Sequence, residues 1–534
     1  MKLKRIVSLT LSVAIIGSLF AGCGKTNTDK ANTKDTPPTA TQAATKEVVT
    51  IKTLKPGNPG ESKIAESIYK KIEEKLKLKL EWEYAPTANY DERVQITMAS
   101  GTLPDIIRFT DVNNVILKAN VDNGNIVDIS PQLKKAPNLM KWTLPESWTS
   151  VQYKGGDKTY MVPVSTMVRA DGFSVRQDWL DKLGIKIEAG KPVTLEQFTD
   201  ILKQFTLNDP DGNGANDTYG LNLFAETTGE IVPVFTPFSI DVLGSAFGLT
   251  GWQKATGEAY EYMDPRFSQK SDKFKKFLDY LATLYKNKYV DPNYPSLKLA
   301  QSEDNFYKGK VGMQFQFAGH VYGREKNVIK VNPNAKLTWI SGIINPEAGK
   351  VTGISYSSGA YGGFAVTKSS KNPDRVVELF DYMLSDEMYP DVSVYGGEGM
   401  GYTLNNGKKV PSDLYLNSTP ITGGMGAFPI MRRSKDPNAF LSLSLDEATR
   451  KTTEAWLGTA VANVVISKDM GFVPKAALDP KFLDFKKKMV EVITKIALGQ
   501  QPSSAYDAVL ADWYKNGGEA YVKEMNDYIK SITK

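Results

Sequence analysis

The residues with the clearest potential for chemistry form one acidic turn. The stretch NDPDGNGANDTYG, residues 208–220, is dense in Asp, Asn and Gly. EF-hand calcium loops draw oxygen ligands from loop positions 1, 3, 5, 7 and 9, with Gly at position 6 and a bidentate Glu at position 12. Because every available donor is oxygen, we expect a hard cation, calcium before magnesium. Counting from Asp209, the predicted calcium ligands are Asp209, Asp211, Asn213, the backbone carbonyl of Ala215, and Asp217.

The end of this turn departs from the calcium pattern. Position 12 is Gly220 and the residue after Asp217 is Thr218, so the bidentate Glu is missing and the sixth ligand stays open. The alternative interpretation is a turn of Asx and Gly residues without an ion, although the spacing favours calcium. A bound calcium could take part in catalysis or only hold the loop, and the rest of the chain bears on that choice.

Few residue combinations that carry catalysis are present. The chain has a single histidine, His320, and a single cysteine, Cys23. This composition excludes zinc proteases of the H-E-x-x-H type, and most nucleophile–histidine pairs unless His320 itself is the base. The glycine-rich run at residues 395–402 lacks the G-K-[ST] ending of a phosphate loop. Glycoside hydrolysis needs only two placed carboxylates, so a surface carbohydrate-active enzyme stays an alternative.

The amino terminus predicts export and a lipid anchor. Residues 1–22 join a basic start to an apolar run, the pattern of a secretory signal peptide. Cys23 follows small residues, and this junction resembles the lipobox of bacterial lipoproteins. That likeness implies a thiol carrying diacylglycerol and acylation such as palmitate. The alternative is an ordinary cleavage site beside an incidental cysteine. Residues 23–47 contain no large apolar side chain, which predicts a flexible tether.

The charge balance argues against nucleic acid as a partner. The formal net charge is +6, from 66 Lys and Arg against 60 Asp and Glu. Three of the basic residues, Lys2, Lys4 and Arg5, leave with the signal peptide, so 63 basic residues remain against 60 acidic ones. No basic run interleaved with aromatic residues follows. We therefore expect no nucleic-acid partner, and membrane contact only through the lipid anchor.

The elements that must position these residues begin near Val48. Residues 48–54, 78–84 and 105–109 have strand patterns, and the segments between them, 64–76 and 90–100, have helical patterns. This order is typical of a parallel sheet, in which ligands bind beyond the carboxyl ends of the strands. We place Asn58 and Asp105 there as ligand contacts, with a turn residue and a cap as their alternatives. Further helices are expected at 272–288, 374–384 and 481–534, and further strands at 309–317 and 362–367.

Several motifs, taken in order, resemble one protein family. They are MASGTLPD (98–105), VRQDWLDKLGI (175–185), LNDPDGNGANDTYGL (207–221), YKGKVGM (307–313), KNPDRVVELFDYMLS (371–385) and YGGEGMGYT (395–403). Together they resemble the bacterial extracellular solute-binding lipoproteins of the family 1 type. The likeness is to the calcium-loop-containing, oligosaccharide-binding subfamily that serves ABC importers.

The resemblance implies an α/β fold of the periplasmic-binding-protein-like type II. Two lobes joined by hinge crossings would close over a ligand in the cleft between them. By this likeness, residues 48–164 plus 316–359 form the first lobe, and residues 165–315 plus 360–534 form the second. It further implies a non-enzymatic, monomeric receptor with a structural calcium. The receptor would be anchored on the extracellular face of a Gram-positive type membrane and would deliver an oligosaccharide to an ABC permease.

Sugar binding needs aromatic platforms and hydrogen-bonding groups. Trp252 follows a glycine-rich run and is the first stacking candidate, and Tyr356, Tyr395 and Tyr402 lie in similar segments. Glu398 joins Asp105 as a polar candidate, whereas Trp179 is assigned to packing. For each aromatic residue the alternative is a place in the core or rim. A same-fold receptor for a peptide or another small solute also stays open.

Overall fold

The computed structural model describes residues 47–533 with short gaps. The residues outside the description are 58–62, 153–156, 166–170, 227–228, 234, 236–239, 353–358, 392–396, 415–432, 437–445 and 463. Glu47–Lys534 forms one compact unit, and the predicted signal peptide, Cys23 and most of the predicted tether lie outside the described residues. None of the described helices is long and apolar enough to cross a bilayer.

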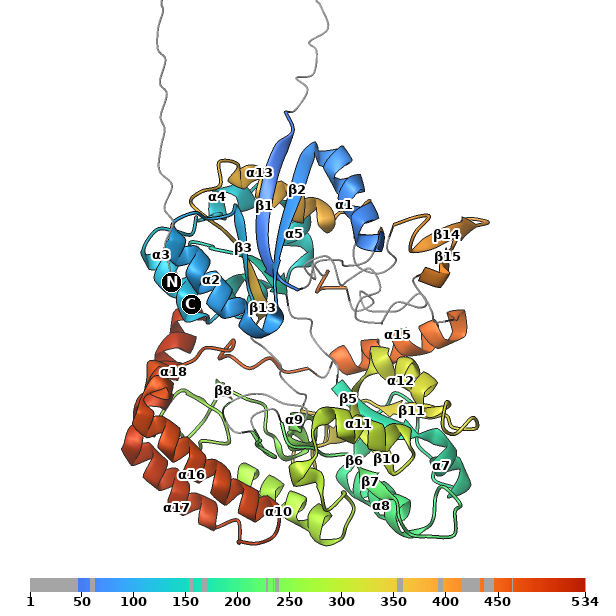
Figure 1. Cartoon of the computed structure of the whole chain (residues 1–534). Coiled ribbons are helices and arrows are strands. Elements are labelled where there is room, and N and C mark those ends of the chain that lie inside the picture. The colour runs from blue at the N-terminus through green and yellow to red at the C-terminus, as the bar shows by residue number, and fades with distance from the viewer. Residues whose placement is uncertain are drawn as a thin grey trace, which may run out of the picture. The chain divides into compact units, whose positions relative to one another are not determined.

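A five-stranded sheet, here called the first-lobe sheet, organises the amino-terminal part of the unit (Figure 1). Its first elements are β1 (Val49–Pro56), α1 (Lys63–Leu76), β2 (Leu78–Ala85), α2 (Tyr90–Ser100) and β3 (Ile106–Phe109). Strand β1 pairs in parallel with β2 and with β3, so that Thr53 lies beside both Trp82 and Ile106. Helix α2 ends at Gly101, whose φ of 73° is the left-handed conformation that glycine adopts without strain. The predicted strand-helix-strand-helix-strand order is confirmed.

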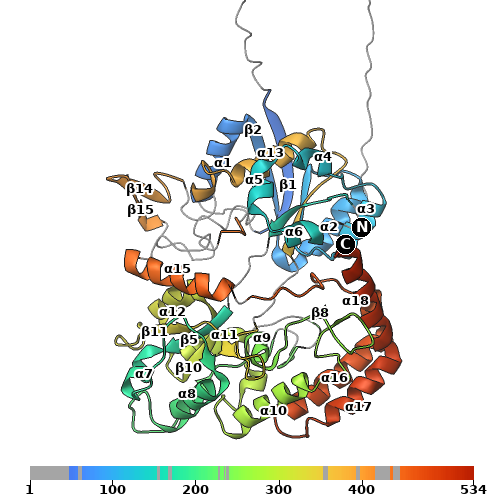
Figure 2. The ribbon, with the colours of Figure 1, turned by 180° about the vertical axis from the view of Figure 1, so that it is seen from behind.

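Two antiparallel strands complete this sheet, in the order β2-β1-β3-β13-β4. They are β4 (Val162–Ser165) and β13 (Ala360–Val366), and β13 pairs with both β3 and β4. Helix α13 (Pro373–Met383) buries side chains in the same core as β1 and β3, and it lies beside α5 (Pro137–Trp142; Figure 2). The prediction that the chain from residue 360 onward belongs to the second lobe is therefore wrong for β13 and α13.

A four-stranded sheet, the second-lobe sheet, has the order β11-β5-β10-β7. Its strands are β5 (Asp171–Arg176), β7 (Tyr219–Leu221), β10 (Val311–Phe317) and β11 (Leu337–Ile340). Strand β10 is parallel to β7, and β5 is antiparallel to both β10 and β11. The prediction that residues 316–359 belong to the first lobe is wrong, because β11 hydrogen-bonds with β5. A strand pattern identifies a strand, but the sheet that it joins depends on long-range pairing.

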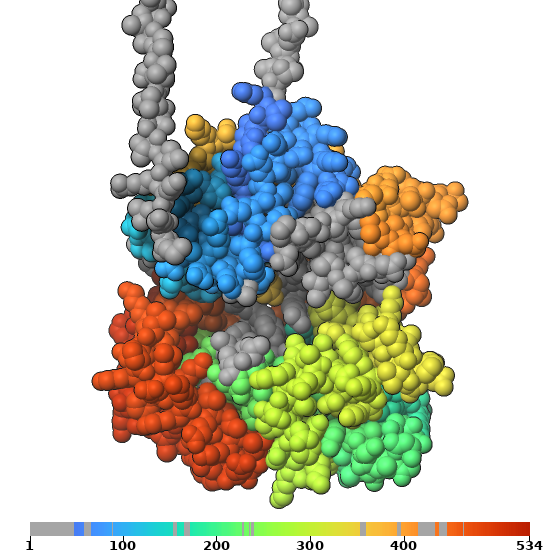
Figure 3. Space-filling view, in the orientation of Figure 1, coloured from blue at the N-terminus to red at the C-terminus, as the bar shows by residue number. Residues whose placement is uncertain are grey.

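Long amphipathic helices cover the second-lobe core. They are α8 (Leu195–Leu207), α10 (Lys273–Lys286), α16 (Pro480–Ala497), α17 (Ala505–Trp513) and α18 (Glu519–Ile532). The helical patterns at 272–288 and 481–534 predict α10 and the carboxyl-terminal helices, whereas α8 was not predicted. Helix α8 begins with a capping box, in which Thr194 accepts from the backbone of Gln197 and the Gln197 side chain accepts from the Thr194 backbone. The carboxyl-terminal helices form a continuous red surface in the space-filling view (Figure 3).

The remaining elements are short or lie outside the two central sheets. Helix α15 (Glu447–Val461) packs Trp456 against Tyr322, with ring centroids 5.5 Å apart. The other described elements are η1 (Thr87–Asn89), α3 (Val115–Asp122), α4 (Ser130–Leu133), α6 (Pro145–Ser150), α7 (Gln177–Lys182), β6 (Val193–Thr194), α9 (Asp241–Gly244), η3 (Ser245–Phe247), β8 (Gln253–Lys254), β9 (Tyr262–Met263), η4 (Tyr294–Ser296), α11 (Leu299–Tyr307), η5 (Ala318–His320), α12 (Val321–Val328), β12 (Ile343–Ile344), β14 (Tyr402–Asn405), β15 (Lys408–Pro411), η7 (Lys475–Leu478) and η8 (Tyr514–Gly518).

Candidate functional site

The carboxyl ends of β2 and β3 open onto a small pocket in the first lobe. After β2 the chain turns through η1 into α2, which brings the first turn of that helix beside the residue that follows β3. The pocket has a volume of about 350 Å³, and its lining supplies hydroxyl, amide and carboxylate groups. These residues are Thr87, Asn89, Tyr90, Asp91, Glu92 and Thr110. Such a set offers hydrogen bonds of both kinds to a polar ligand.

A buried scaffold holds this pocket in place. The Tyr90 hydroxyl donates to the carbonyls of Leu54 (3.1 Å) and Arg108 (2.6 Å), which ties α2 to β1 and β3. Burial raises the pKa of the Tyr90 hydroxyl, so it stays a donor. The Arg108 guanidinium donates to the carbonyls of Phe109, Tyr361 and Gly363, and burial lowers its pKa to about 10.

Sequence reasoning missed Tyr361, the exposed aromatic residue at this edge. Because β13 runs antiparallel to β3, with Gly363 opposite Phe109, the start of β13 lies at the carboxyl end of β3. The Tyr361 side chain is 47% exposed. Gly362 follows with a φ of 74°, and a Cβ there would lie 2.0 Å from the Phe109 carbonyl oxygen. A tyrosine next to a glycine pair at the start of a strand was the available signal.

Asp105 lies at the other end of β3 from this pocket. It precedes Ile106, the first residue of the strand, and its Oδ2 accepts from the Lys52 backbone N–H at 2.9 Å. The placement of Asp105 at the carboxyl edge is therefore wrong. The sequence motif predicted an acidic residue beside a strand, but it did not indicate which end of that strand faces the ligand. Asn58, Tyr356 and Tyr395 lie outside the described residues.

Two of the predicted stacking residues lie in cores instead. Trp252 is 3% exposed and stacks on Phe267 at 5.8 Å, so neither ring face is open to a sugar. Tyr402 is 5% exposed, and its hydroxyl lies 3.0 Å from Asp391 Oδ1. Glu398 is exposed, and its backbone forms an isolated β-bridge with Tyr402, the first residue of the β14–β15 hairpin. The glycine-rich flank correctly predicted a loop at Trp252, whereas Tyr402 begins strand β14. Neither flank indicated whether the side chain is exposed.

The predicted calcium loop connects α8 to β7 and closes on itself. Asp209 has a φ of 45°, and its carboxylate accepts the backbone N–H groups of Gly212, Asn213 and Gly214 at 2.9 to 3.1 Å. The Asn213 amide nitrogen lies 3.0 Å from Asp211 Oδ2 and 3.1 Å from Asp217 Oδ1. Four of the five predicted ligand residues thus converge through hydrogen bonds.

The electrostatics of this loop suit a cation. Burial, the hydrogen bond with Asp209 and the charge of Asp217 together raise the pKa of Asp211. Burial also pushes the pKa of Asp209 upward, but the backbone N–H groups outweigh it and hold that pKa below its usual range. Among the described residues no group of three or more His, Cys, Asp and Glu side chains has metal-binding geometry. The donor chemistry fits calcium, and the Asn213 amide stands between the carboxylates.

Beyond the end of β7 the chain carries a half-buried carboxylate. Val311 pairs with Tyr219 and Met313 with Leu221, the last residue of β7. Glu226 follows five residues later and is half-buried. Burial and the charge of Asp241 raise the pKa of Glu226 to about 7.

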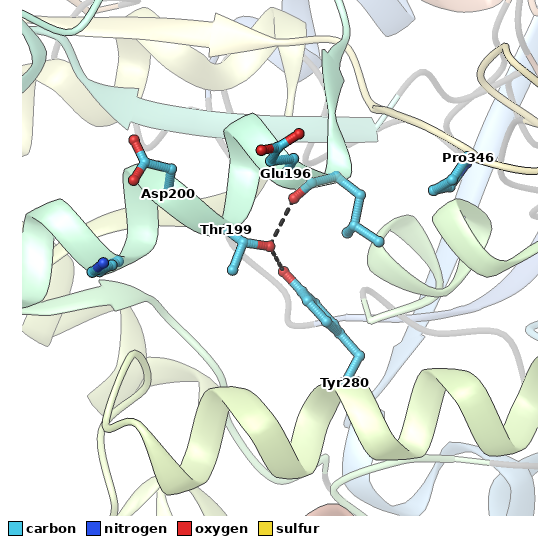
Figure 4. Close-up of a pocket in the computed structure, with 7 residues that line it drawn as sticks. Glu196, Thr199, Asp200, Tyr280 and Pro346 are labelled. Carbon is cyan, nitrogen blue, oxygen red and sulfur yellow. Dashed lines mark hydrogen bonds between the residues drawn. The ribbon is translucent and has the colours of Figure 1, made fainter.

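A larger pocket lies between helices α8 and α10 (Figure 4). Its volume is about 570 Å³, and a 2.8 Å hydrogen bond joins Thr199 Oγ1 and the Tyr280 hydroxyl in its lining. The lining residues are Leu195, Glu196, Thr199, Asp200, Lys203, Tyr280 and Pro346. They come from helix flanks and one turn, not from the carboxyl ends of β7 or β10.

The family of the chain follows from comparison with known proteins. The model for bacterial extracellular solute-binding proteins matches residues 57–390, more than half of the chain. The chain belongs to this family. Two Bacillus subtilis proteins, the polygalacturonan/rhamnogalacturonan-binding protein YtcQ and the lipoprotein LipO, are each 24% identical over 542 residues. Each alignment covers 98% of this chain and 98% of the relative.

Solved structures show the fold. An HMO binding, ABC-transporter associated solute binding protein from Bifidobacterium longum infantis has 17% identity and a TM-score of 0.67, and the match covers 92% of this chain and 99% of that one. An EF-hand mutant of the Streptococcus pneumoniae substrate binding protein FusA, in complex with fructo-nystose, has 16% identity and a TM-score of 0.59, covering 90% and 99%. The predicted periplasmic-binding-protein-like type II fold is confirmed.

Proposed function

We propose that this family member is a lipid-anchored receptor that captures an oligosaccharide and delivers it to an ABC permease. The observation that carries the proposal is the pocket at the carboxyl ends of β2 and β3, next to the exposed Tyr361. Hydroxyl, amide and carboxylate groups beside an accessible ring are the chemistry that binds sugar hydroxyls and C–H faces. The names of YtcQ and of the Bifidobacterium longum infantis protein support a carbohydrate ligand.

The fold supports a mode of action for this receptor. We infer that the two lobes close over the ligand by a hinge motion and present a joint surface to the permease. Cys23 would carry the lipid anchor on the extracellular face of the membrane, which the lipoprotein LipO supports as a relative. The receptor would act as a monomer without catalysis. A same-fold receptor for a peptide and a carbohydrate-active enzyme are the competing hypotheses.

A ligand screen separates these hypotheses. Thermal unfolding of the purified protein is measured with oligosaccharides, glycan fragments and peptides, because a ligand at 100 times its Kd adds about 2.7 kcal/mol to stability. We expect stabilisation by an oligosaccharide without product formation, and weaker binding by Tyr361→Ala with an unchanged melting temperature. Stabilisation by peptides alone would favour the peptide receptor, and sugar products would favour the enzyme.

We further propose that the 209–217 turn binds a structural calcium. Asp209, Asp211, Asn213, the Ala215 carbonyl and Asp217 would hold it, with water as the remaining ligand. The EF-hand named in the FusA structure supports a calcium loop in this fold. When bound, the ion would neutralise crowded carboxylates and stiffen the α8–β7 connection.

The calcium proposal has its own test. Asp217→Asn is the useful variant because the Asp217 carboxylate accepts only from Asn213 in this loop, whereas Asp209 also holds three backbone N–H groups. Calcium at 100 times its Kd should add about 2.7 kcal/mol to the stability of the wild type, and much less to that of the variant. Ligand specificity should be the same with calcium and with a chelator. An equal calcium response in both proteins would contradict these ligands.

A further inference from the structure

The charged side chains that line the first-lobe pocket are both acidic. Asp91 and Glu92 lie in the first turn of α2, are exposed, and line the pocket at the carboxyl ends of β2 and β3. The other lining residues carry hydroxyl or amide groups, and no lysine or arginine is among the residues that the structure describes there. The pocket therefore has a definite sign of charge, which bears on the class of sugar that it accepts.

The two carboxylates keep most of their capacity to accept hydrogen bonds. Within the described part of the chain, the one hydrogen bond that reaches either of them comes from Asn114, whose Nδ2 lies 3.5 Å from Asp91 Oδ1. Asn89 occupies the N-cap position of α2, yet its side chain makes no capping hydrogen bond. Since an ionised carboxylate accepts from several donors, Asp91, Glu92 and the Asn89 amide all remain available to a ligand.

The cations near this pocket are directed elsewhere. The buried Arg108 guanidinium donates to three backbone carbonyls of β3 and β13. Arg93 follows Glu92 in α2, but its Nε donates to Glu83 Oε1 at 3.1 Å. Lys118 Nζ donates to Asn113 Oδ1 at 3.2 Å. None of these three side chains lines the pocket.

Two further sources of positive charge lie at this edge of the sheet. Lys55, near the end of β1, is 5% exposed, and its Nζ lies 5.3 Å and 4.7 Å from the ring centroids of Trp82 and Tyr84. It is thus buried against β2 and is not part of the pocket lining. The N-terminus of α2 carries about half an elementary positive charge, which the carboxylates of Asp91 and Glu92 in the same turn outweigh.

We propose that the first-lobe pocket selects a saccharide ring without a carboxylate, and that Asp91 and Glu92 accept hydrogen bonds from its hydroxyl groups. The inference rests on the proposed oligosaccharide function and names the class of sugar. The hydroxyls of a neutral ring donate to the two carboxylates and accept from the Asn89 amide. A uronate would instead bring a third negative charge into a pocket whose described lining has no cation to pair with it, and like charges at close range oppose binding.

The experiment measures affinity by calorimetry at pH 7.5. The probes are neutral galacto-, manno- and fructo-oligosaccharides, oligogalacturonates, and methyl-esterified oligogalacturonates, which have the same backbone without the charge. We expect the tightest ligand to be neutral, and the free acid to bind at least about 10-fold more weakly than its methyl ester. Raising the salt from about 0.05 M to about 0.5 M should narrow the gap between acid and ester, because salt screens exposed charges.

The double variant Asp91→Asn, Glu92→Gln keeps the size of both side chains and removes both charges. It should bind the neutral ligand about 10-fold more weakly, because hydrogen bonds to charged acceptors are the stronger ones. It should also bind the acid and the ester with similar affinity. The double variant Asp484→Asn, Glu491→Gln is the matched control, because these side chains of α16 are 75% and 64% exposed and it changes the net charge equally.

The outcomes distinguish this inference from the proposed function. A neutral ligand that is weakened only in the pocket variant supports the inference. Equal affinities of the wild type and the pocket variant for every saccharide overturn it and leave the oligosaccharide receptor standing. Oligogalacturonates that bind the wild type more tightly than their methyl esters also overturn it, again without touching the receptor. If no saccharide binds, or if products form, the proposed function itself is overturned and the inference with it.

Discussion

Replacing Asp469 by Asn should stabilise the second lobe at neutral pH. Asp469 lies two residues after Ser467, whose hydroxyl hydrogen-bonds to the Asp469 carboxylate, and it lies near the buried Asp264 and Arg266. Burial is the largest influence and raises the pKa of Asp469 from the ordinary 3.8 to about 6. The Asn side chain keeps the size and hydrogen-bonding capacity while removing the charge.

The magnitude follows from the size of this shift. A difference of about 2 units between native and unfolded pKa corresponds to roughly 3 kcal/mol, since one unit is worth about 1.4 kcal/mol. Because the native pKa of Asp469 is the higher one, the native state holds the proton more tightly. The penalty is therefore absent at low pH, grows as the pH rises from 3.8 to 6, and is complete above pH 6. Asp469→Asn should add up to about 3 kcal/mol at pH 7.5 and little at pH 4.

Thermal unfolding between pH 4 and pH 7.5 tests this reasoning. Each kcal/mol shifts the melting temperature of a unit of 150 to 250 residues by about 2 to 4 °C. Asp484→Asn is the control, because the Asp484 side chain is 75% exposed. A loss of stability in Asp469→Asn at both ends of the pH range would refute the reasoning, since it would mean that hydrogen bonds hold the ionised carboxylate.

Two substitutions test Trp252 and Tyr402, which were predicted to contact the ligand but are buried in the structure. Trp252→Ala should cost about 3 to 5 kcal/mol in the free energy of unfolding, because a buried ring stacked on Phe267 is lost, with unchanged ligand affinity in the folded protein. Denaturant unfolding and calorimetry measure the two effects. Tyr402→Phe should cost about 1 to 3 kcal/mol because buried Asp391 loses a hydrogen bond, again without change in affinity. Weaker ligand binding at full stability would contradict either assignment.

The individual helices and strands of this fold could be predicted from the sequence because local interactions determine them. Helix α2 ends at Gly101 because glycine alone accepts the left-handed turn without cost, and Pro104 prevents continuation. The alternation from Leu78 to Tyr84 fixes β2, whose side chains face the core and solvent in turn. Capping, periodicity and turn chemistry act within a few residues of sequence, so one chain carries them in full.

The sheet to which each strand belongs could not be predicted from the sequence in the same way. Strand β13 inserts between β3 and β4, far away in sequence, and its pairing is decided by contacts such as Gly363 with Phe109. Strand β10 has the same apolar character, yet pairs with β5 and β7. Both strands are buried on both faces, so their hydrophobicity carries no information about which core they enter. The predicted lobe boundaries were wrong for this reason.

In the acidic turn, the type of a residue does not by itself determine the role of that residue. Thr218 directly follows the last predicted ligand, Asp217, and it is 2% exposed, with its hydroxyl donating to the Phe205 carbonyl at 2.7 Å. That bond caps the end of α8, so Thr218 anchors the turn rather than binding the ion. On the other side, Lys182 Nζ donates to the Asp209 carbonyl at 2.8 Å. The turn is thus fastened to α8 and α7 by its own contacts, and a calcium would act on its carboxylates and leave those fastenings unchanged. Removal of calcium should therefore loosen the loop without unfolding the lobe.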